Sequence, residues 1–189
     1  LVTVYNLVFT GLSLGRHLSL NSTYLDLGLE SQAVWNASQG RWFETSFGSD
    51  GSLVSALSYH VTPFIALLAP FYRLLPFPIT LLAIQTFVVS LGAVAIYLLA
   101  RKILKSTWVA LVFVFVYLLY PPLEYANLFD FHYVTLSTTL LLFAFYFMLE
   151  KRWRLFYTFL ILAVLTKENV ALVASLLGLY LFWILKERK

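Results

Sequence analysis

Apolar runs separated by short basic segments make up the second half of the chain. Phe77–Ala100 carries no charged residue and, as a helix of about 36 Å, is long enough to cross a hydrocarbon core of about 30 Å. Shorter apolar runs follow at close spacing: Trp108–Tyr120, Tyr133–Leu149, Trp153–Thr166 and Val170–Leu185. This pattern predicts an all-α polytopic membrane protein, in which a bundle of transmembrane helices crosses the bilayer.

The first part of the chain has a different pattern. Leu1–Gly15 is apolar and is predicted to be the outer part of a first transmembrane helix, whereas Arg16–Tyr59 is a long polar stretch. Phe64–Leu75 is apolar but bounded by Pro63 and Pro76, and its helical length of about 18 Å is too short to cross the membrane. We therefore expect an outer loop that contains interfacial helices.

Composition favours a single membrane domain over residues 1–189, with the outer loop at 16–76 and the transmembrane helices at 77–189. The chain is 61% hydrophobic and 12% charged, and its mean hydropathy is +0.84, so polar residues are too few to cover a soluble domain. The absence of Cys excludes disulfides and thiolate metal ligands. A net charge of +4, placed in local clusters, does not favour nucleic-acid binding.

Basic residues lie at every second helix end. They form three clusters: Arg101, Lys102 and Lys105; Lys151, Arg152 and Arg154; and Lys186, Arg188 and Lys189. The positive-inside rule places these clusters in the cytoplasm. Most acidic residues then lie at the alternate, outward-facing helix ends. We therefore expect a multi-pass protein of the plasma membrane with its functional site on the extracytoplasmic face.

Ionisable residues near hydrocarbon are costly, so those at the outward-facing ends are candidates for function. Asp26 and Glu30 follow Asn21-Ser22-Thr23, which is typical of a helix N-cap, and their spacing places both on one helix face. Asp26 fits two interpretations: a functional carboxylate, or an ordinary capping residue that interacts with the helix dipole.

Two His residues mark further candidates. His60 precedes the interfacial helix, where a structural hydrogen bond is the commoner role. His132 ends the short outward loop Asn127-Leu128-Phe129-Asp130-Phe131-His132, and its spacing from Asp130 directs both side chains the same way in an extended chain. An Asp-x-His pair suits a metal ion or a phosphate-bound metal, but it also occurs in ordinary polar turns.

The turn that contains Lys167 and Glu168 is the fourth candidate. The preceding run Trp153–Thr166 is about 21 Å long as a helix, so the turn is expected below the outer surface, as a self-neutralised ion pair or in a wet crevice. The four candidate segments are those around Asp26, around His60, at Asp130–His132 and at Lys167–Glu168. They carry acidic, basic and imidazole groups, and all are expected on one side of the membrane. Such a set suits a divalent cation (Mg²⁺ or Mn²⁺), a phosphate leaving group and a carboxylate that accepts a proton from a hydroxyl.

The order of these elements resembles the GT-C glycosyltransferase superfamily. More closely, five segments resemble the predicted membrane proteins grouped as Domain of Unknown Function 2079: Asp26-Leu27-Gly28, Gln32-Ala33-Val34-Trp35-Asn36, His60-Val61-Thr62-Pro63, Asn127-Leu128-Phe129-Asp130-Phe131-His132 and Lys167-Glu168. The resemblance covers essentially the whole chain and implies that the chain is the N-terminal half of a longer domain.

The resemblance to GT-C enzymes implies that a sugar moves from a polyprenyl-phosphate-linked donor to an acceptor on the extracytoplasmic face. Asp26 would then activate the acceptor, and Asp130 would be the second catalytic carboxylate. Asp130 and His132 would hold a divalent metal ion or orient the lipid phosphate. The substrate-binding residues implied in this way are His60, His132, Lys167, Glu168 and Gln32.

Two other functions are compatible with the sequence. A transporter or lipid flippase is the main alternative, although the centres of Phe77–Ala100 and Tyr133–Leu149 carry no charge and no inverted repeat is evident. A non-catalytic membrane scaffold would leave Asp26 and Asp130 far apart. The deciding expectation is geometric, because the glycosyltransferase hypothesis requires Asp26, Asp130 and Lys167–Glu168 to surround one outward-open pocket.

Overall fold

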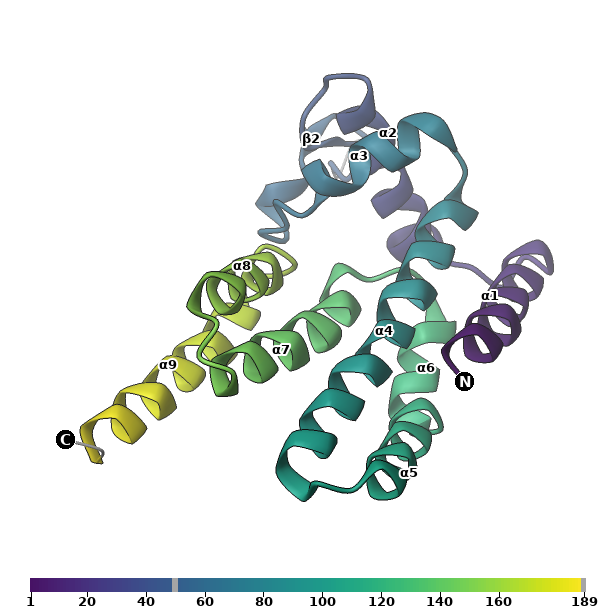
Figure 1. Ribbon diagram of the computed structural model, residues 1–189. Helices are drawn as coiled ribbons and strands as arrows, with labels where there is room; N and C mark the ends of the chain where they lie inside the picture. Colours follow the sequence, from purple (N-terminus) through teal and green to yellow (C-terminus); the bar gives the residue numbers. More distant parts are fainter. Residues whose placement is uncertain (49–50, 188–189) are drawn as a thin grey trace.

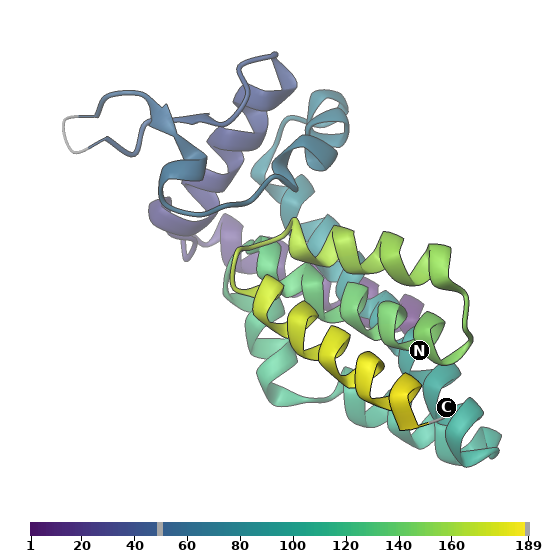
Figure 2. The same cartoon turned by 90° about the vertical axis from the view of Figure 1, so that its left-hand side faces the viewer.

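The computed structural model describes the backbone of residues 1–48 and 51–187, and the side chains of these residues up to Trp183. Most of this part of the chain is helical, which confirms the all-α prediction. Figures 1 and 2 show a set of long helices and a smaller part that covers one end of them. We call this smaller part, residues 24–75, the cap.

The helices outside the cap run alternately away from it and toward it (Figure 1). Those that run away from the cap are α4 (Pro78–Leu104), α7 (Tyr133–Leu149) and α9 (Val170–Glu187). Those that run toward the cap are α1 (Val2–Leu18), α5 (Thr107–Leu118), α6 (Pro121–Phe129) and α8 (Trp153–Val164). The connections therefore lie at the cap end or at the opposite end, except the bend between α5 and α6, which run in the same direction.

Among the described residues, α4 is the helix that is long and apolar enough to cross a membrane. It matches the spanning segment predicted at Phe77–Ala100. Helices α5 and α6 bend by 44° at their junction and form a second candidate if they are taken as one span. The other apolar helices are shorter, so the number of crossings expected from the sequence stays a prediction.

Helix α6 differs from what the sequence indicated. The segment Asn127–His132 was expected to be a loop that follows an apolar run ending at Tyr120. The helix forms because Pro121 and Pro122 occupy its first positions, where the missing N–H of proline costs no hydrogen bond. Only the extended residues between α6 and α7 connect the two helices, and Asp130 is fully extended there (φ −163°, ψ −173°).

The cap contains two helices and a short hairpin. Helix α2 (Leu29–Ser38) packs on α3 (Ile65–Leu74), which is the short interfacial helix predicted at Phe64–Leu75. Strands β1 (Glu44–Thr45) and β2 (Val54–Ser55) pair antiparallel between them, with Glu44 opposite Ser55. A two-residue ladder contributes little by itself, so the packing of α2 against α3 holds the cap together.

A buried apolar cluster joins the cap to the long helices. It includes Leu27 and Val34 from the α2 side, Ile65 from α3, Leu81 from α4 and Leu136 from α7, each at most 1% exposed. A backbone hydrogen bond from Phe64 N–H to the Leu165 carbonyl (3.0 Å) ties the cap to the end of α8. The cap is therefore fixed relative to the helix ends on which it sits.

The basic clusters at the two turns opposite the cap lie close together. Lys102 Nζ, at the end of α4, is 2.6 Å from Glu150 Oε1 in the α7–α8 turn. This ion pair connects the first basic cluster to the turn that carries the second. The third cluster, Lys186, Arg188 and Lys189, has side chains that lie outside the described residues.

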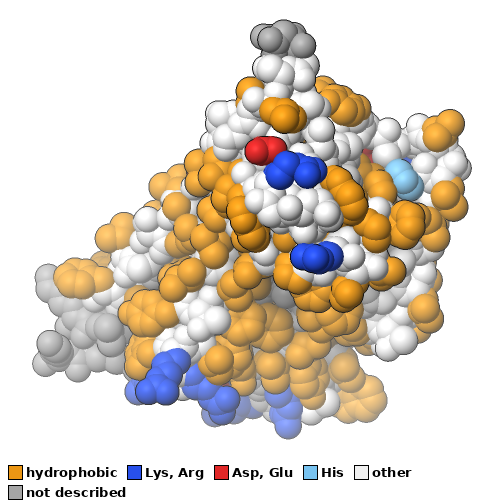
Figure 3. Space-filling model, turned by 90° about the horizontal axis from the view of Figure 1, so that it is seen from above, with side chains coloured by type: hydrophobic (Ala, Val, Ile, Leu, Met, Phe, Trp, Pro, Cys, Tyr) orange, Lys and Arg blue, Asp and Glu red, His pale blue; other side chains and the backbone are white. Residues whose placement is uncertain are grey.

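Large apolar side chains cover much of the molecular surface. Figure 3, viewed from the cap end, shows them distributed over the visible face, interspersed with polar and backbone atoms. Leu7 in α1, Trp108 in α5 and Phe182 in α9 are 72%, 81% and 68% exposed. Apolar surface of this extent is typical of contact with lipid or with further helices.

Candidate functional site

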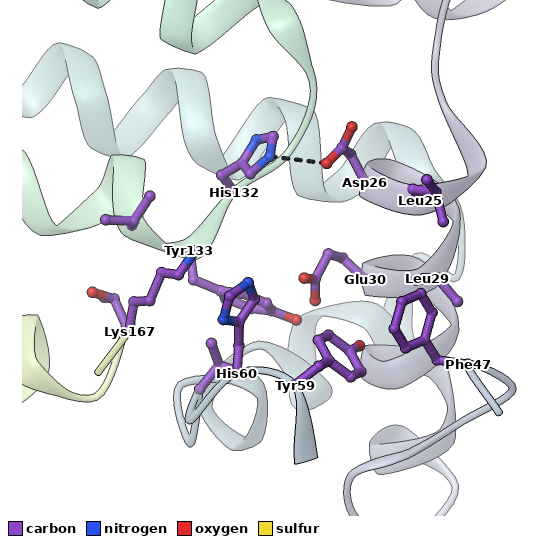
Figure 4. Close-up of a pocket in the computed structure, with 13 residues that line it drawn as sticks. Leu25, Asp26, Leu29, Glu30, Phe47, Tyr59, His60, His132, Tyr133 and Lys167 are labelled. Carbon is purple, nitrogen blue, oxygen red and sulfur yellow. Dashed lines mark hydrogen bonds and ion pairs between the residues drawn. The ribbon is translucent and has the colours of Figure 1, made fainter. Parts of the chain in front are cut away.

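A pocket of about 500 Å³ lies where the cap meets the ends of the long helices. Its polar lining comes from segments that are far apart in the sequence (Figure 4). These residues are Asp26, Glu30, Tyr59, His60, Thr62, His132, Tyr133, Thr166 and Lys167. The pocket therefore brings together residues from all four places that the sequence analysis identified.

Asp26 lies in a π-helical turn, Tyr24–Gly28, at the start of the cap. The Thr23 hydroxyl accepts a hydrogen bond from the Asp26 backbone N–H (3.1 Å), which confirms the predicted N-cap. The Asp26 Oδ1 atom is 3.2 Å from Nε2 of His132 (Figure 4). Both side chains are about one-third exposed, so this acid–imidazole pair is accessible from the pocket.

The His132 ring is held from several sides. Its backbone N–H donates to the Gln85 side-chain oxygen (2.8 Å). The imidazole stacks on Phe129, with ring centroids 5.7 Å apart, and the Arg16 guanidinium lies 5.4 Å from the centroid of the same Phe129 ring. These contacts direct Nε2 of His132 toward Asp26.

Asp130 lies behind this pair and does not line the pocket. It is 1% exposed, and its Oδ2 accepts hydrogen bonds from the Thr23 N–H (2.9 Å) and hydroxyl (3.1 Å). The Thr23 hydroxyl is also 2.7 Å from Asp26 Oδ2, so one threonine contacts both carboxylates. Asp26 and Asp130 therefore lie close together, and the catalytic role of Asp130 stays a prediction.

Gln85 is a site residue that the sequence analysis did not identify. It is fully buried in α4, and its amide donates to the carbonyls of Asn127 (3.2 Å) and Asp130 (2.9 Å). With the bond from the His132 N–H, this side chain fixes the backbone on which Asp130 and His132 stand. A lone Gln in a charge-free apolar helix was the available signal, because a buried amide is costly unless it is paired.

Glu30 also lines the pocket, one helical turn after Asp26 and on the same face, as the spacing predicted. Burial raises the pKa of Glu30 from 4.5 to about 7; the Tyr133 hydroxyl and the Lys167 ammonium oppose this shift, and the charge of Asp26 adds to it. In Figure 4 the Glu30 carboxyl group points into the pocket toward Tyr133 and Tyr59. Glu30 is therefore poised to change charge near neutral pH.

The Lys167–Glu168 turn does not form the self-neutralised pair that was one expectation. Glu168 Oε1 is instead 3.0 Å from His60 Nδ1, and Oε2 accepts from the Val61 N–H (3.0 Å). Hydrogen bonds from its own backbone N–H, from His60 and from Val61 keep the pKa of Glu168 below its usual value. Lys167 lines the pocket and has no ion-pair partner within 4.0 Å in the described part of the chain.

Gln32 lies outside the pocket lining. Its side-chain oxygen accepts hydrogen bonds from the Ser46 N–H (3.0 Å), the Ser46 hydroxyl (3.0 Å) and the Thr45 hydroxyl (3.2 Å). This amide holds the β1 end of the hairpin against α2. The contacts account for Gln32 as a structural residue, and its predicted contact with substrate is untested.

The described side chains near the pocket do not supply the three grouped ligands that a divalent metal ion usually needs. Among the side chains that the structure describes, no three His, Asp or Glu residues are grouped so that they could hold one. Asp130 is turned away and bonded to Thr23, and His132 Nε2 faces Asp26. A metal bound through Nε2 of His132 would have to displace Asp26 from this nitrogen, and the metal site expected at Asp130 and His132 stays a prediction.

The helical fold and the apolar surface are compatible with an α-helical membrane protein. Residues 16–189 match the family described as Predicted membrane protein (DUF2079), and the chain belongs to this family. This match confirms the resemblance to Domain of Unknown Function 2079, whereas the resemblance to GT-C enzymes stays a prediction. Neither the curated proteins nor the solved structures include a significant match to the chain.

Proposed function

We propose that this protein is a GT-C-type glycosyltransferase that moves a sugar from a polyprenyl-phosphate-linked donor to an acceptor hydroxyl. The observation that carries the proposal is the composition of one pocket. An acid–imidazole pair, Asp26 and His132, lines it together with the ammonium group of Lys167, which has no ion-pair partner among the described residues. Sugar transfer from a phosphate needs these two functions, a base and a positive charge.

In the proposed reaction Asp26 accepts the proton of the acceptor hydroxyl. The acceptor oxygen then bonds to the anomeric carbon of the sugar, while the bond from that carbon to the phosphate oxygen breaks. The electron pair stays on the polyprenyl phosphate, and Lys167 stabilises its charge. His132 orients the Asp26 carboxylate through the 3.2 Å contact. Asp130 positions Asp26 through Thr23, and the proposal includes no step that uses a metal.

We also propose that the pocket faces the extracytoplasmic side of a multi-pass protein in the plasma membrane. The basic clusters at the two turns connected by Lys102 and Glu150 lie at the end opposite the cap. The positive-inside rule assigns such basic turns to the cytoplasm. A lipid-linked donor would then reach the pocket from the outer leaflet, with its phosphate near Lys167.

Transfer assays on the full-length protein test this proposal. Membranes that contain it are incubated with polyprenyl-phosphate-linked hexoses carrying a radiolabel, and these membranes also supply the acceptor. The measurement is the fraction of label that leaves the lipid phase. Because Asp26→Asn removes the base but keeps the shape of the side chain, we expect transfer to fall by about 10³-fold.

Glu44→Gln is the matched control. Glu44 lies in β1 of the cap, outside the pocket lining, and its carboxylate is 3.8 Å from Arg41. We expect this variant to transfer sugar at the wild-type rate. Transfer that survives in Asp26→Asn would refute the role of this aspartate, and label that stays in the lipid phase with every donor would refute the proposed function.

A further inference from the structure

Two tyrosine hydroxyls lie beside Glu30 at the pocket wall. Within the part of the chain that the structure describes, the hydroxyl groups of Tyr59 and Tyr133 have no partner in full hydrogen-bond geometry, although the Tyr133 hydroxyl lies near enough to the Glu30 carboxyl group to oppose the rise of its pKa. Tyr133 as a whole is 3% exposed. Buried hydroxyls without partners are rare and costly, so such groups at a pocket wall indicate a ligand that completes them.

The three polar groups converge from three separate elements. Glu30 comes from α2, Tyr59 from the segment before α3, and Tyr133 from the first residue of α7. All three line the pocket, and Figure 4 shows the Tyr59 hydroxyl directed toward Glu30. The site is thus built by the tertiary fold, as is usual for a binding site on a rigid scaffold.

An aromatic rim lies next to these groups. Phe47 lines the pocket, is 45% exposed, and packs on Tyr59 with ring centroids 4.8 Å apart. An exposed aromatic ring beside a carboxylate and two hydroxyls offers an apolar face and hydrogen-bond acceptors at once. A sugar has the same two properties, because its C–H bonds form apolar faces and its hydroxyl groups lie around the ring edge.

We infer that Glu30, Tyr59 and Tyr133 form a subsite that binds adjacent hydroxyl groups of a sugar ring, with Phe47 against the face of that ring. The carboxylate accepts hydrogen bonds from the sugar, and each tyrosine hydroxyl both donates and accepts. This inference deepens the proposed function and rests on it for the identity of the ligand as a sugar. It assigns sugar recognition to residues other than Asp26 and His132.

Binding of free sugars tests the inference without any transfer reaction. The full-length protein in nanodiscs is titrated with glucose, galactose and mannose, and binding is measured by saturation-transfer NMR. At about pH 8, where Glu30 is mostly charged, we expect Glu30→Gln to weaken binding of the preferred hexose by about 10-fold or more. Tyr133→Phe and Tyr59→Phe, which remove only a hydroxyl group, should each weaken it about 5-fold.

Two variants away from the pocket serve as controls. Tyr157→Phe removes a hydroxyl from an exposed tyrosine in α8, and Glu44→Gln neutralises a carboxylate in β1. Both should bind the hexose as the wild type does. Equal affinity in the wild type, Glu30→Gln and Tyr133→Phe would overturn the inference, and so would the failure of all three hexoses to bind.

The two proposals fail in different ways. If hexose binding depends on Glu30 and Tyr133 but no labelled sugar leaves a polyprenyl phosphate, the subsite stands and the proposed transfer reaction is wrong. If transfer depends on Asp26 but neither transfer nor hexose binding depends on Glu30 and Tyr133, the reaction stands and the subsite is wrong. Saturation transfer mapped onto individual sugar protons provides a further check, because protons beside Phe47 should receive the strongest effect.

Discussion

The Nε2 atom of His132 lies 3.2 Å from Oδ1 of Asp26, although 106 positions separate the two residues in the sequence. Thr23 strengthens this connection, since it contacts both Asp26 and Asp130. The cap is therefore joined to the α6–α7 connection by these polar contacts, in addition to the buried apolar cluster that joins it to the long helices. The polar contacts place an accessible carboxylate beside an imidazole at the pocket.

The coupling between Asp26 and His132 is testable by a double-mutant cycle. Because His132 is proposed to act through Asp26, His132→Gln should lower sugar transfer by about 10- to 100-fold, less than Asp26→Asn does. The double variant should be no slower than Asp26→Asn alone, since removal of the base leaves nothing to orient. The measurement is the initial rate of label transfer at equal protein levels. Losses that multiply in the double variant would show that the two residues act independently.

Gln85 should be important for stability. Gln85→Leu keeps the volume of the side chain but leaves the carbonyl of Asp130 and the N–H of His132 without their partner. We expect a loss of about 2–4 kcal/mol in the free energy of unfolding, measured by thermal unfolding in detergent. Gln39→Leu is the control, because Gln39 is exposed at the end of α2 and should cost less than about 0.5 kcal/mol. A Gln85→Leu protein as stable as the control would contradict the positioning role.

Gly92 permits the close packing of α4 against α5 and α7. A Cβ atom added there would overlap the Tyr117 side chain and would lie 2.9 Å from the Thr139 hydroxyl oxygen. The Tyr117 hydroxyl donates to the Val89 carbonyl (2.9 Å), so the ring cannot move without losing this bond. Gly92→Ala should destabilise the protein by about 1–3 kcal/mol in thermal unfolding.

Gly178 provides the comparison for that prediction. It lies in α9, and nothing stands within 4 Å of a Cβ atom built there. Because alanine favours a helix over glycine, Gly178→Ala should leave stability unchanged or raise it by up to about 1 kcal/mol. If both Gly→Ala variants behaved alike, the proposed contact of α4 with Tyr117 would not limit the packing.

Glu30 should make stability depend on pH. The pKa of this carboxyl group rises from 4.5 to about 7 on folding, so the native state binds more protons than the unfolded state between these values. Stability should therefore fall as pH rises from about 4.5 to about 7 and should level off above that range. The titratable groups that face Glu30 across the pocket are Asp26, Tyr59, His60, His132, Tyr133 and Lys167.

Glu30→Gln isolates this contribution. At about pH 8 the variant should be more stable than the wild type by up to about 3 kcal/mol, because an amide has no charge to bury. At about pH 5 the difference should be much smaller, since Glu30 is then protonated. Thermal unfolding at the two pH values measures both differences. An identical pH dependence in the two proteins would mean that other groups control it.

Several elements were predictable because their causes are local. The apolar run at Phe77–Ala100 predicted α4, the prolines around Phe64–Leu75 predicted a short α3, and Thr23 predicted the N-cap of the turn that carries Asp26. Length, periodicity and capping act over a few residues, so the sequence displays them directly. Helix α6 was not predicted, since the sequence analysis ended the apolar run at Tyr120 and expected a loop at Asn127–His132.

Which polar side chains contact one another could not be predicted from neighbouring residues in the sequence. Asp130 and His132 are two residues apart, yet one is buried against Thr23 and the other lines the pocket. The neighbouring Lys167 and Glu168 likewise separate, because Glu168 pairs with His60, 108 positions away. Nothing in the spacing of these residues distinguishes such outcomes.

By itself, therefore, the sequence determined the helical membrane class, the position of the long helices and the group of polar residues at their ends. Only the tertiary structure decided which of those residues share a pocket and which form structural hydrogen bonds instead. It also decided that Glu30 and Gln85 belong to the site. The physical reason is that burial and hydrogen bonding of a polar group depend on what the folded chain brings against it, whereas apolar length and helix capping depend on neighbouring residues.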